Sequence, residues 1–229
     1  MIRLFIYIPS GKLFNVLICY YKVYCVINVL DSEGEAVLFK TMVFANTPEC
    51  LVFTQEEEVD DMNKDNKKNK ANVLIIGLRD TPYLLYLNCS SLTERRVSLN
   101  EKEWDTHASF TPLQLSLSPD KKLLAVATDK SLHFVYLVGS NTRVATLAGH
   151  ACSDYGRPRC AWDPSSKYVY SNSEDDNLLH VYSIASGRIV ASLRGHAGLV
   201  KDISCCGVTG VVASVSYDKS LILWKDCSM

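Results

Sequence analysis

Few side chains in this 229-residue sequence are placed for catalysis or metal binding. The five histidines stand apart from one another, and the nine cysteines include no Cys-x-x-Cys pair and no cluster at the spacing of a zinc site. Two acidic pairs, Asp60-Asp61 and Asp175-Asp176, have the residue types for acid/base or metal chemistry, but one lies in a highly charged run and the other in a polar turn. We therefore predict no metal and no cofactor.

The motifs of the common enzyme classes are also missing. No G-x-S-x-G nucleophile turn, H-E-x-x-H zinc helix, G-x-x-x-x-G-K phosphate loop or G-x-G-x-x-G dinucleotide loop occurs in the sequence. His133 and His180 fall inside strand-like runs, where a hydrogen-bonded structural histidine is far commoner than a catalytic one. We therefore expect a protein that is not an enzyme.

The composition favours a globular protein with no bulk electrostatic preference for nucleic acid. With 48% apolar residues the chain can bury a large core, and 24 Lys and Arg against 25 Asp and Glu leave a formal net charge of -1. We expect no nucleic-acid partner. An odd number of cysteines without a regular framework is typical of free thiols in a reducing compartment, so we expect a cytoplasmic protein, with the nucleus as the alternative.

The apolar first thirty residues raise the question of a signal or membrane helix. A spanning helix needs roughly 20 consecutive apolar residues, and Lys12, Lys22 and the Pro9-Ser10-Gly11 turn interrupt this segment. Its β-branched and aromatic residues favour strands. We predict three short strands here and no transmembrane segment.

A turn followed by an apolar strand recurs along the chain, as "ATDKSLHFVYL", "SEDDNLLHVYS" and "SYDKSLILWK". Four such strands close on an aromatic residue at steps of 50, 46 and 42 residues, namely Tyr86, Tyr136, Tyr182 and Trp224. Acidic turn residues keep the same spacing, at Asp80, Asp129, Asp175 and Asp218. Gly149-His150 and Gly195-His196 precede the last two copies. Four short antiparallel strands in each unit of about 40 to 45 residues predict the blades of a β-propeller.

On these motifs the chain resembles the WD40-repeat family, most clearly from Ser109 to Lys225. The resemblance implies an all-β propeller of four-stranded antiparallel blades, in which a His, a Ser or Thr, an Asp and a Trp of one blade are hydrogen-bonded to one another. The last repeat fits this pattern with His196, Ser214 or Ser216, Asp218 and Trp224. The repeat before it offers His150, Asp175 or Asp176, and Tyr182, which has no indole N–H, so its network must differ.

We expect one propeller region over residues 1–229, with about five blade-like units at roughly 1–35, 36–90, 91–139, 140–186 and 187–229. A charged run inside the second unit, 55–71, has almost no apolar residues and is expected to be a disordered loop. In the family an outer strand from the start of the chain completes the last blade, but here the first unit begins in its inner strand. We therefore expect an incomplete propeller that is part of a longer one.

Function is expected on the loops at the rim of the propeller. The loop "GHACSDYGRPRCAW" carries Tyr155, Arg157 and Arg159, residue types enriched in binding hot spots, and Arg194 precedes the next Gly-His. Ordinary solvated charges are the alternative interpretation of these arginines. The resemblance implies a non-catalytic scaffold that binds other proteins in a multiprotein complex. The alternative function is phosphoinositide binding at a membrane surface, for which only Arg194 stands where such relatives carry an Arg-Arg pair.

Overall fold

The computed structural model describes residues 2–7, 13–19, 24–30, 36–58, 69–102, 104–153 and 156–225 of the chain. Within these ranges the backbone forms five antiparallel sheets. The same ranges include no apolar helix of membrane-spanning length.

Strands that follow one another in the chain are neighbours in each sheet. The first two sheets contain β1 (Ile2–Tyr7), β2 (Leu13–Cys19), β3 (Tyr24–Leu30) and β4 (Ala36–Val43), and then β5 (Pro48–Glu58), β6 (Asn69–Leu78), β7 (Tyr83–Asn88) and β8 (Glu94–Ser98). The next two contain β9 (Pro112–Leu117), β10 (Leu123–Thr128), β11 (Leu132–Leu137) and β12 (Arg143–Ala148), and then β13 (Cys160–Trp162), β14 (Tyr168–Asn172), β15 (Leu179–Ser183) and β16 (Arg188–Leu193). The fifth sheet contains β17 (Val200–Cys205), β18 (Val212–Ser216) and β19 (Leu221–Trp224).

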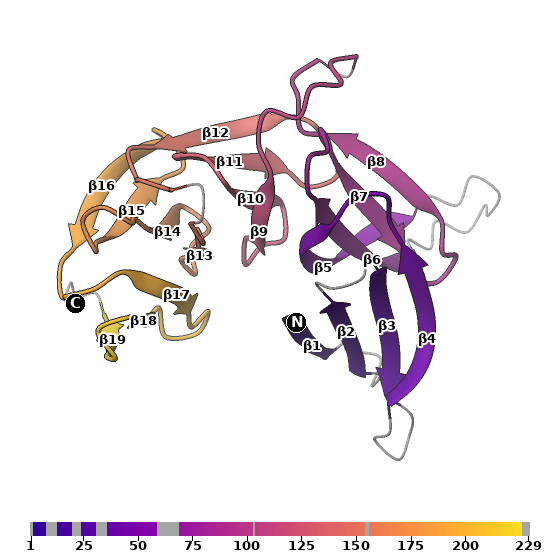
Figure 1. Cartoon of the computed structure of the whole chain (residues 1–229), viewed down its shortest axis with the longest axis horizontal. Coiled ribbons are helices and arrows are strands. Elements are labelled where there is room, and N and C mark those ends of the chain that lie inside the picture. The colour runs from indigo at the N-terminus through magenta and orange to yellow at the C-terminus, as the bar shows by residue number, and fades with distance from the viewer. Residues whose placement is uncertain are drawn as a thin grey trace.

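The five sheets are arranged as the blades of a propeller. Figure 1 shows them around a common centre, with β1, β5, β9, β13 and β17 innermost and β4, β8, β12 and β16 outermost. Inner strands of neighbouring sheets contact each other, β5 with β9, β9 with β13, and β13 with β17. The predicted all-β propeller with about five blade-like units is confirmed, as are the three strands in the first thirty residues.

The sheets and the expected sequence units are offset by one strand. The expected units that start at residues 36, 91, 140 and 187 begin with β4, β8, β12 and β16, which form the outer edges of the preceding sheets. Among the described residues the fifth sheet has three strands, and its edge strand β19 leaves the side chains of Leu221 and Leu223 61% and 64% exposed.

The expected disordered loop at 55–71 is shorter than predicted. Residues 55–58 pair with residues 69–72 and extend the β5–β6 hairpin outward. A backbone ladder does not require apolar side chains, and here the Gln55 side-chain amide also donates to Asn72 Oδ1 at 3.1 Å across the pair. The prediction was therefore wrong for both ends of this run, and residues 59–68 lie outside the described residues.

The hydrophobic core lies between the sheets. Apolar side chains of the second sheet pack against those of the third, in a cluster that includes Val73, Ile75, Leu84, Leu124, Val126 and Phe134. Similar clusters join the third sheet to the fourth and the fourth to the fifth. Since neighbouring sheets cover each other's faces, no blade can bury its apolar surface alone.

Truncation of an inter-sheet leucine should test this packing. Leu124 on β10 is fully buried, so Leu124→Ala should lower the free energy of unfolding by about 2–5 kcal/mol. The matched change Leu221→Ala, at a residue that is 61% exposed, should cost less than about 1 kcal/mol. Denaturant unfolding followed by circular dichroism measures both, and equal losses would contradict the assigned core.

Candidate functional site

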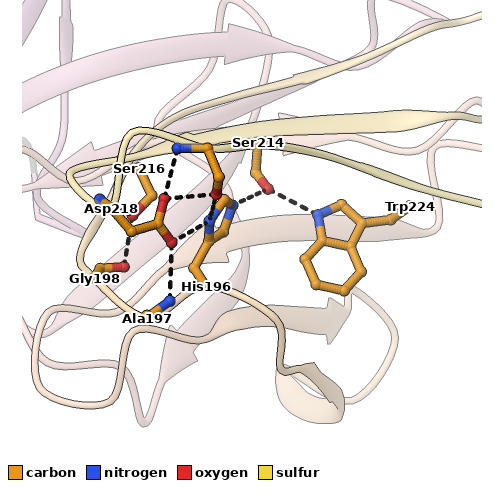
Figure 2. A network of polar contacts seen from close by, with 8 residues as sticks. His196, Ala197, Gly198, Ser214, Ser216, Asp218 and Trp224 are labelled. Atoms are coloured by element: carbon orange, nitrogen blue, oxygen red, sulfur yellow. Dashed lines mark hydrogen bonds and ion pairs between the residues drawn. The ribbon is translucent and has the colours of Figure 1, made fainter.

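One hydrogen-bonded network joins two strands of the fifth sheet, β18 and β19, to the connection that precedes β17. His196, in the connection before β17, has its Nε2 2.8 Å from the hydroxyl of Ser214 on β18. The indole Nε1 of Trp224 on β19 donates to the same hydroxyl oxygen at 2.8 Å. On its other side, Nδ1 of His196 lies 3.0 Å from Oδ2 of Asp218, as Figure 2 shows.

The chemistry of these groups fixes the direction of the hydrogen bonds. An ionised carboxylate only accepts, so Nδ1 of His196 carries the proton and Nε2 accepts from Ser214, whose oxygen accepts from Trp224. Asp218 also accepts from the backbone N–H of Ala197 at 2.9 Å. Hydrogen bonds, first of all the one from Ser220, hold the pKa of the Asp218 carboxyl well below its usual range.

Small and polar residues at the turn complete the arrangement. The Ser216 hydroxyl donates to the carbonyl of Gly198 at 2.8 Å and so ties the end of β18 to the connection before β17. The Ser214 hydroxyl instead links the rings of His196 and Trp224. A residue with a side chain does not fit at position 195 unless its surroundings shift, because an added Cβ would lie 2.7 Å from the ring of Trp224. The missing side chain at Gly195 thus allows the Trp224 ring to lie against the backbone, with the His196 ring edge-on to it and the two ring centroids 6.4 Å apart.

The middle repeat forms a different network. The Tyr182 hydroxyl lies 3.0 Å from Nδ1 of His150. Asp175 is exposed and makes no contact with His150 among the described hydrogen bonds and ion pairs, so its prediction as a network member was wrong. Asp176 is the equivalent of Asp218, since each stands six residues before the closing aromatic, and its Oδ1 accepts the backbone N–H of Leu178. Both acidic residues lie in the turn, and Oδ2 of Asp176 is 3.3 Å from Nε2 of His180, whereas the described contacts bring neither carboxylate to His150.

A pair of buried imidazoles joins the third and fourth sheets. The rings of His133 on β11 and His150 lie 3.8 Å apart, and Nε2 of His133 is 2.8 Å from the hydroxyl of Ser171. Burial, and next the neighbouring His150, hold the pKa of His133 well below its usual value, while burial lowers the pKa of His150 to about 4. Both rings are therefore neutral near pH 7. Within the described parts of the chain no three His, Cys, Asp or Glu residues converge on a metal site.

The predicted rim residues have different environments. Arg157 is exposed, whereas Arg159 is half-buried, with Nε 3.6 Å from Asp202 Oδ1 and Nη1 donating to the carbonyl of Pro158. Arg194 is exposed in the connection after β16. Tyr155 lies outside the described residues. Of these residues, only Arg157 lines the hollow described next.

A hollow of about 150 Å³ lies on the rim where the fourth and fifth sheets meet, and it is lined by Ser153, Arg157, Glu174, Leu199, Val200, Lys201 and Tyr217. The ring of Tyr217 is 63% exposed, with Nζ of Lys201 4.5 Å from its centroid. The Glu174 carboxylate accepts the backbone N–H groups of Ser153 and Arg157 and so holds the long loop against the β14–β15 turn. An exposed aromatic ring beside two cations is suited to binding a peptide or a protein loop.

Sequence reasoning missed Lys201, Tyr217 and Glu174. The available signal was the position of Tyr217, directly before the Asp218 turn and therefore at the same rim as the Gly195-His196 connection.

Loss of the hydroxyl shared by His196 and Trp224 should weaken the fifth sheet. Ser214→Ala removes the partner of both His196 and Trp224 and leaves two buried polar groups unpaired, so we expect a loss of about 1–3 kcal/mol in the free energy of unfolding. Ser204→Ala, at an exposed position on β17, is the matched control and should leave stability unchanged. An equal effect of the two changes in denaturant unfolding would show that the network carries no stability.

Acid should destabilise the fold through the imidazole pair. The unfolded chain binds protons at its histidines near pH 6.5, whereas the folded state keeps His133 and His150 neutral. Stability is therefore complete above about pH 6.5 and falls as pH decreases toward 4, with a slope of up to about 2.7 kcal/mol per pH unit for two protons. His107→Gln, at an exposed residue, should leave the slope unchanged. A flat stability profile between pH 6.5 and 4 would contradict the neutral buried pair.

Comparison with known proteins supports the repeat and the fold. A family model described as "WD domain, G-beta repeat" matches residues 187–225. The chain is 38% identical to periodic tryptophan protein 2 of Saccharomyces cerevisiae over 65 residues, 28% of this chain and 7% of that protein. It is 33% identical to a bromodomain and WD repeat-containing protein of Dictyostelium discoideum over 77 residues, 34% of this chain and 3% of that protein.

Two further matches cover more of the chain. UBP9-binding protein bun62 of Schizosaccharomyces pombe is 28% identical over 116 residues, which are 47% of this chain and 20% of bun62. A chain in the crystal structure of the mitotic checkpoint complex has a TM-score of 0.53 and 21% identity, with 68% of this chain and 44% of that chain covered. The chain thus spans a fifth or less of these curated relatives and under half of the solved chain. The chain therefore contains a WD40 repeat at residues 187–225, and its fold is that of a WD40-type β-propeller.

Proposed function

We propose that this chain is a non-catalytic scaffold that binds partner proteins on the rim formed by its fourth and fifth sheets. The observation that carries the proposal is the hollow beside Tyr217, where an exposed aromatic ring, Lys201 and Arg157 lie together on loops held by backbone hydrogen bonds. Loop residues that are already held by hydrogen bonds, as Ser153 and Arg157 are held by Glu174, lose less conformational freedom on binding, which favours affinity. The basic and aromatic lining favours a partner segment that carries acidic and apolar side chains.

The polar groups that might serve catalysis are already occupied. His196 and Ser214 are buried, and each is hydrogen-bonded within the blade. His133 is likewise buried against Ser171. A nucleophile and a base in such positions support the fold, and a substrate has no access to them. This arrangement supports a binding function over a catalytic one.

The relatives support a protein partner. The name of bun62 states that it binds UBP9, and the chain is 28% identical to it over 116 residues. The match covers 20% of bun62, so the identity of the partner is not carried over with it. What is carried over is the general expectation of protein binding by the repeats.

We also propose that the protein resides in a reducing compartment, with the cytoplasm first and the nucleus second. Cys89 and Cys160 are buried, and burial raises the pKa of their thiols to about 11 and about 12. Such thiols stay protonated and serve as small packing groups.

The proposal is tested by comparing the proteins that co-purify with the parent chain and with a variant that lacks Lys201 and Tyr217. The endogenous protein, tagged and purified gently, should co-purify with defined proteins, and the double change Lys201→Glu with Tyr217→Ala should remove at least one of them. The double change Lys167→Glu with Tyr168→Ala is the matched control, because these exposed residues lie at the opposite rim, at the end of the β13–β14 turn and the start of β14. Unaltered recovery after the first change would contradict the rim site. If no protein co-purifies and the purified chain co-sediments with liposomes that contain phosphoinositides, the phosphoinositide alternative is favoured.

A further inference from the structure

A second hollow lies on the circumference of the propeller, far larger than the one on the rim. Its volume is about 720 Å³, and its lining includes Tyr83, Arg95, Arg96, Val97, Ser98 and Asp105. Four consecutive residues of β8 contribute to it, so the hollow follows the edge of that strand rather than one face of the sheet. We call it the β8 groove. On its far side is the β11–β12 turn of the third sheet, residues 139–141.

The strand beside the groove has unpaired backbone groups. β8 is the outer strand of its sheet and pairs only with β7 within the described sheet. Leu99 N–H donates to the Pro82 carbonyl, and Asn88 N–H donates to the Thr93 carbonyl. These two bonds show that every second residue of β8, in step with Thr93 and Leu99, is hydrogen-bonded to β7. By this alternation the N–H and C=O of Arg96 and Ser98 point away from β7. An edge of this kind can accept a further strand.

Two arginines at the groove have different partners. Nη2 of Arg95 contacts both carboxylate oxygens of Glu56, at 2.6 and 2.7 Å, and Nη1 donates to the carbonyl of Gly139. The guanidinium of Arg96 lies 4.7 Å from the ring centroid of Tyr83. Among the described residues no carboxylate lies within ion-pair distance of Arg96. Arg96 is therefore a cation held in place by an aromatic ring and available to an incoming anion.

The next blade has no equivalent of Arg96. Arg143 corresponds to Arg95, because it pairs with the closing aromatic Tyr136 as Arg95 pairs with Tyr86. The position of Arg96, opposite Leu85, is occupied on β12 by Ala145, opposite Val135. Arg143, on the outer strand β12, lies 4.4 Å from the ring of Phe134, and its Nη1 is 3.5 Å from Glu101. Arg95 and Arg143 thus share a glutamate partner and a place over an aromatic ring. Of these two outer strands, only β8 adds a neighbouring cation that has no ion-pair partner among the described residues, beside a long groove. The difference indicates a site rather than a general property of outer strands.

We propose that β8 is a docking strand for an extended acidic segment of a partner protein. The segment adds to the sheet as a further strand through the backbone groups of Arg96 and Ser98 and places one of its carboxylates on the guanidinium of Arg96. Asp105 lines the same groove and disfavours a segment that is acidic along its whole length. This site lies outside the rim hollow, and its failure would leave the proposed function intact.

Selection from random octapeptides tests the chemistry of the segment. A phage-displayed library is selected on the full-length chain, and the recovered peptides are counted again on Arg96→Glu. The retained sequences should carry an acidic residue and should be lost on the variant. The strongest one, synthesised with a fluorescent label, should bind Arg96→Glu at least about 10-fold more weakly by anisotropy. Arg188→Glu, the same change on the outer strand β16, is the matched control and should bind like the parent chain.

Backbone methylation of that peptide tests the mode of binding. In an added strand, alternate N–H groups face β8, so N-methylation of one alternate set should abolish binding and methylation of the other set should preserve it. The proposal would be overturned by a library that yields no binder, by peptides that bind Arg96→Glu unchanged, or by equal effects of the two methylated forms. It would also be overturned if binding were lost in the Lys201→Glu and Tyr217→Ala variant, because the peptide would then occupy the rim.

Discussion

Burial of one sheet's face against the next is the interaction on which the rest of this structure depends. A four-stranded antiparallel sheet cannot hide both faces by itself, and here the side chains of Leu124, Val126 and Phe134 are covered by the second sheet. On the fifth sheet, Val215, Leu221 and Leu223 share a face that no described sheet covers, and all three are exposed. Stability of a propeller is therefore shared between neighbours, in the manner of other repeat proteins.

Packing sets the distance between sheets, and the polar networks set the positions of the loops. His196, Ser214 and Trp224 link a connection to two strands of one sheet, while Asp218 ties the next turn to the same histidine. Since these groups are buried and paired, they leave little chemistry for the surface. What remains exposed on the rim is a set of charged and aromatic side chains held by fixed loops, which is the arrangement expected of a binding surface.

The sequence was informative where one residue type has one physical task. The spacing of the turns and closing aromatics predicted the blades, and Gly195-His196 and Trp224 marked the best repeat because a ring, a glycine and a histidine fit together only at that spacing. It was less informative where position depends on a neighbouring sheet. The stacking of His133 on His150 joins residues of two sheets, and the choice of Asp176 over Asp175 depends on the local turn. The extension of β5 and β6 into the charged run could not be predicted from hydrophobicity, because a backbone ladder carries it.

The central claim is that partners bind at the rim that contains the β10–β11, β14–β15 and β18–β19 turns. Cross-linking of the purified native complex with a lysine-reactive reagent, followed by mass spectrometry, measures this directly, since exposed lysines lie on both rims. The claim predicts that cross-links to partner proteins fall on Lys130, Lys201 and Lys219. Cross-links confined to Lys121, Lys122 and Lys167, at the opposite rim, would contradict it.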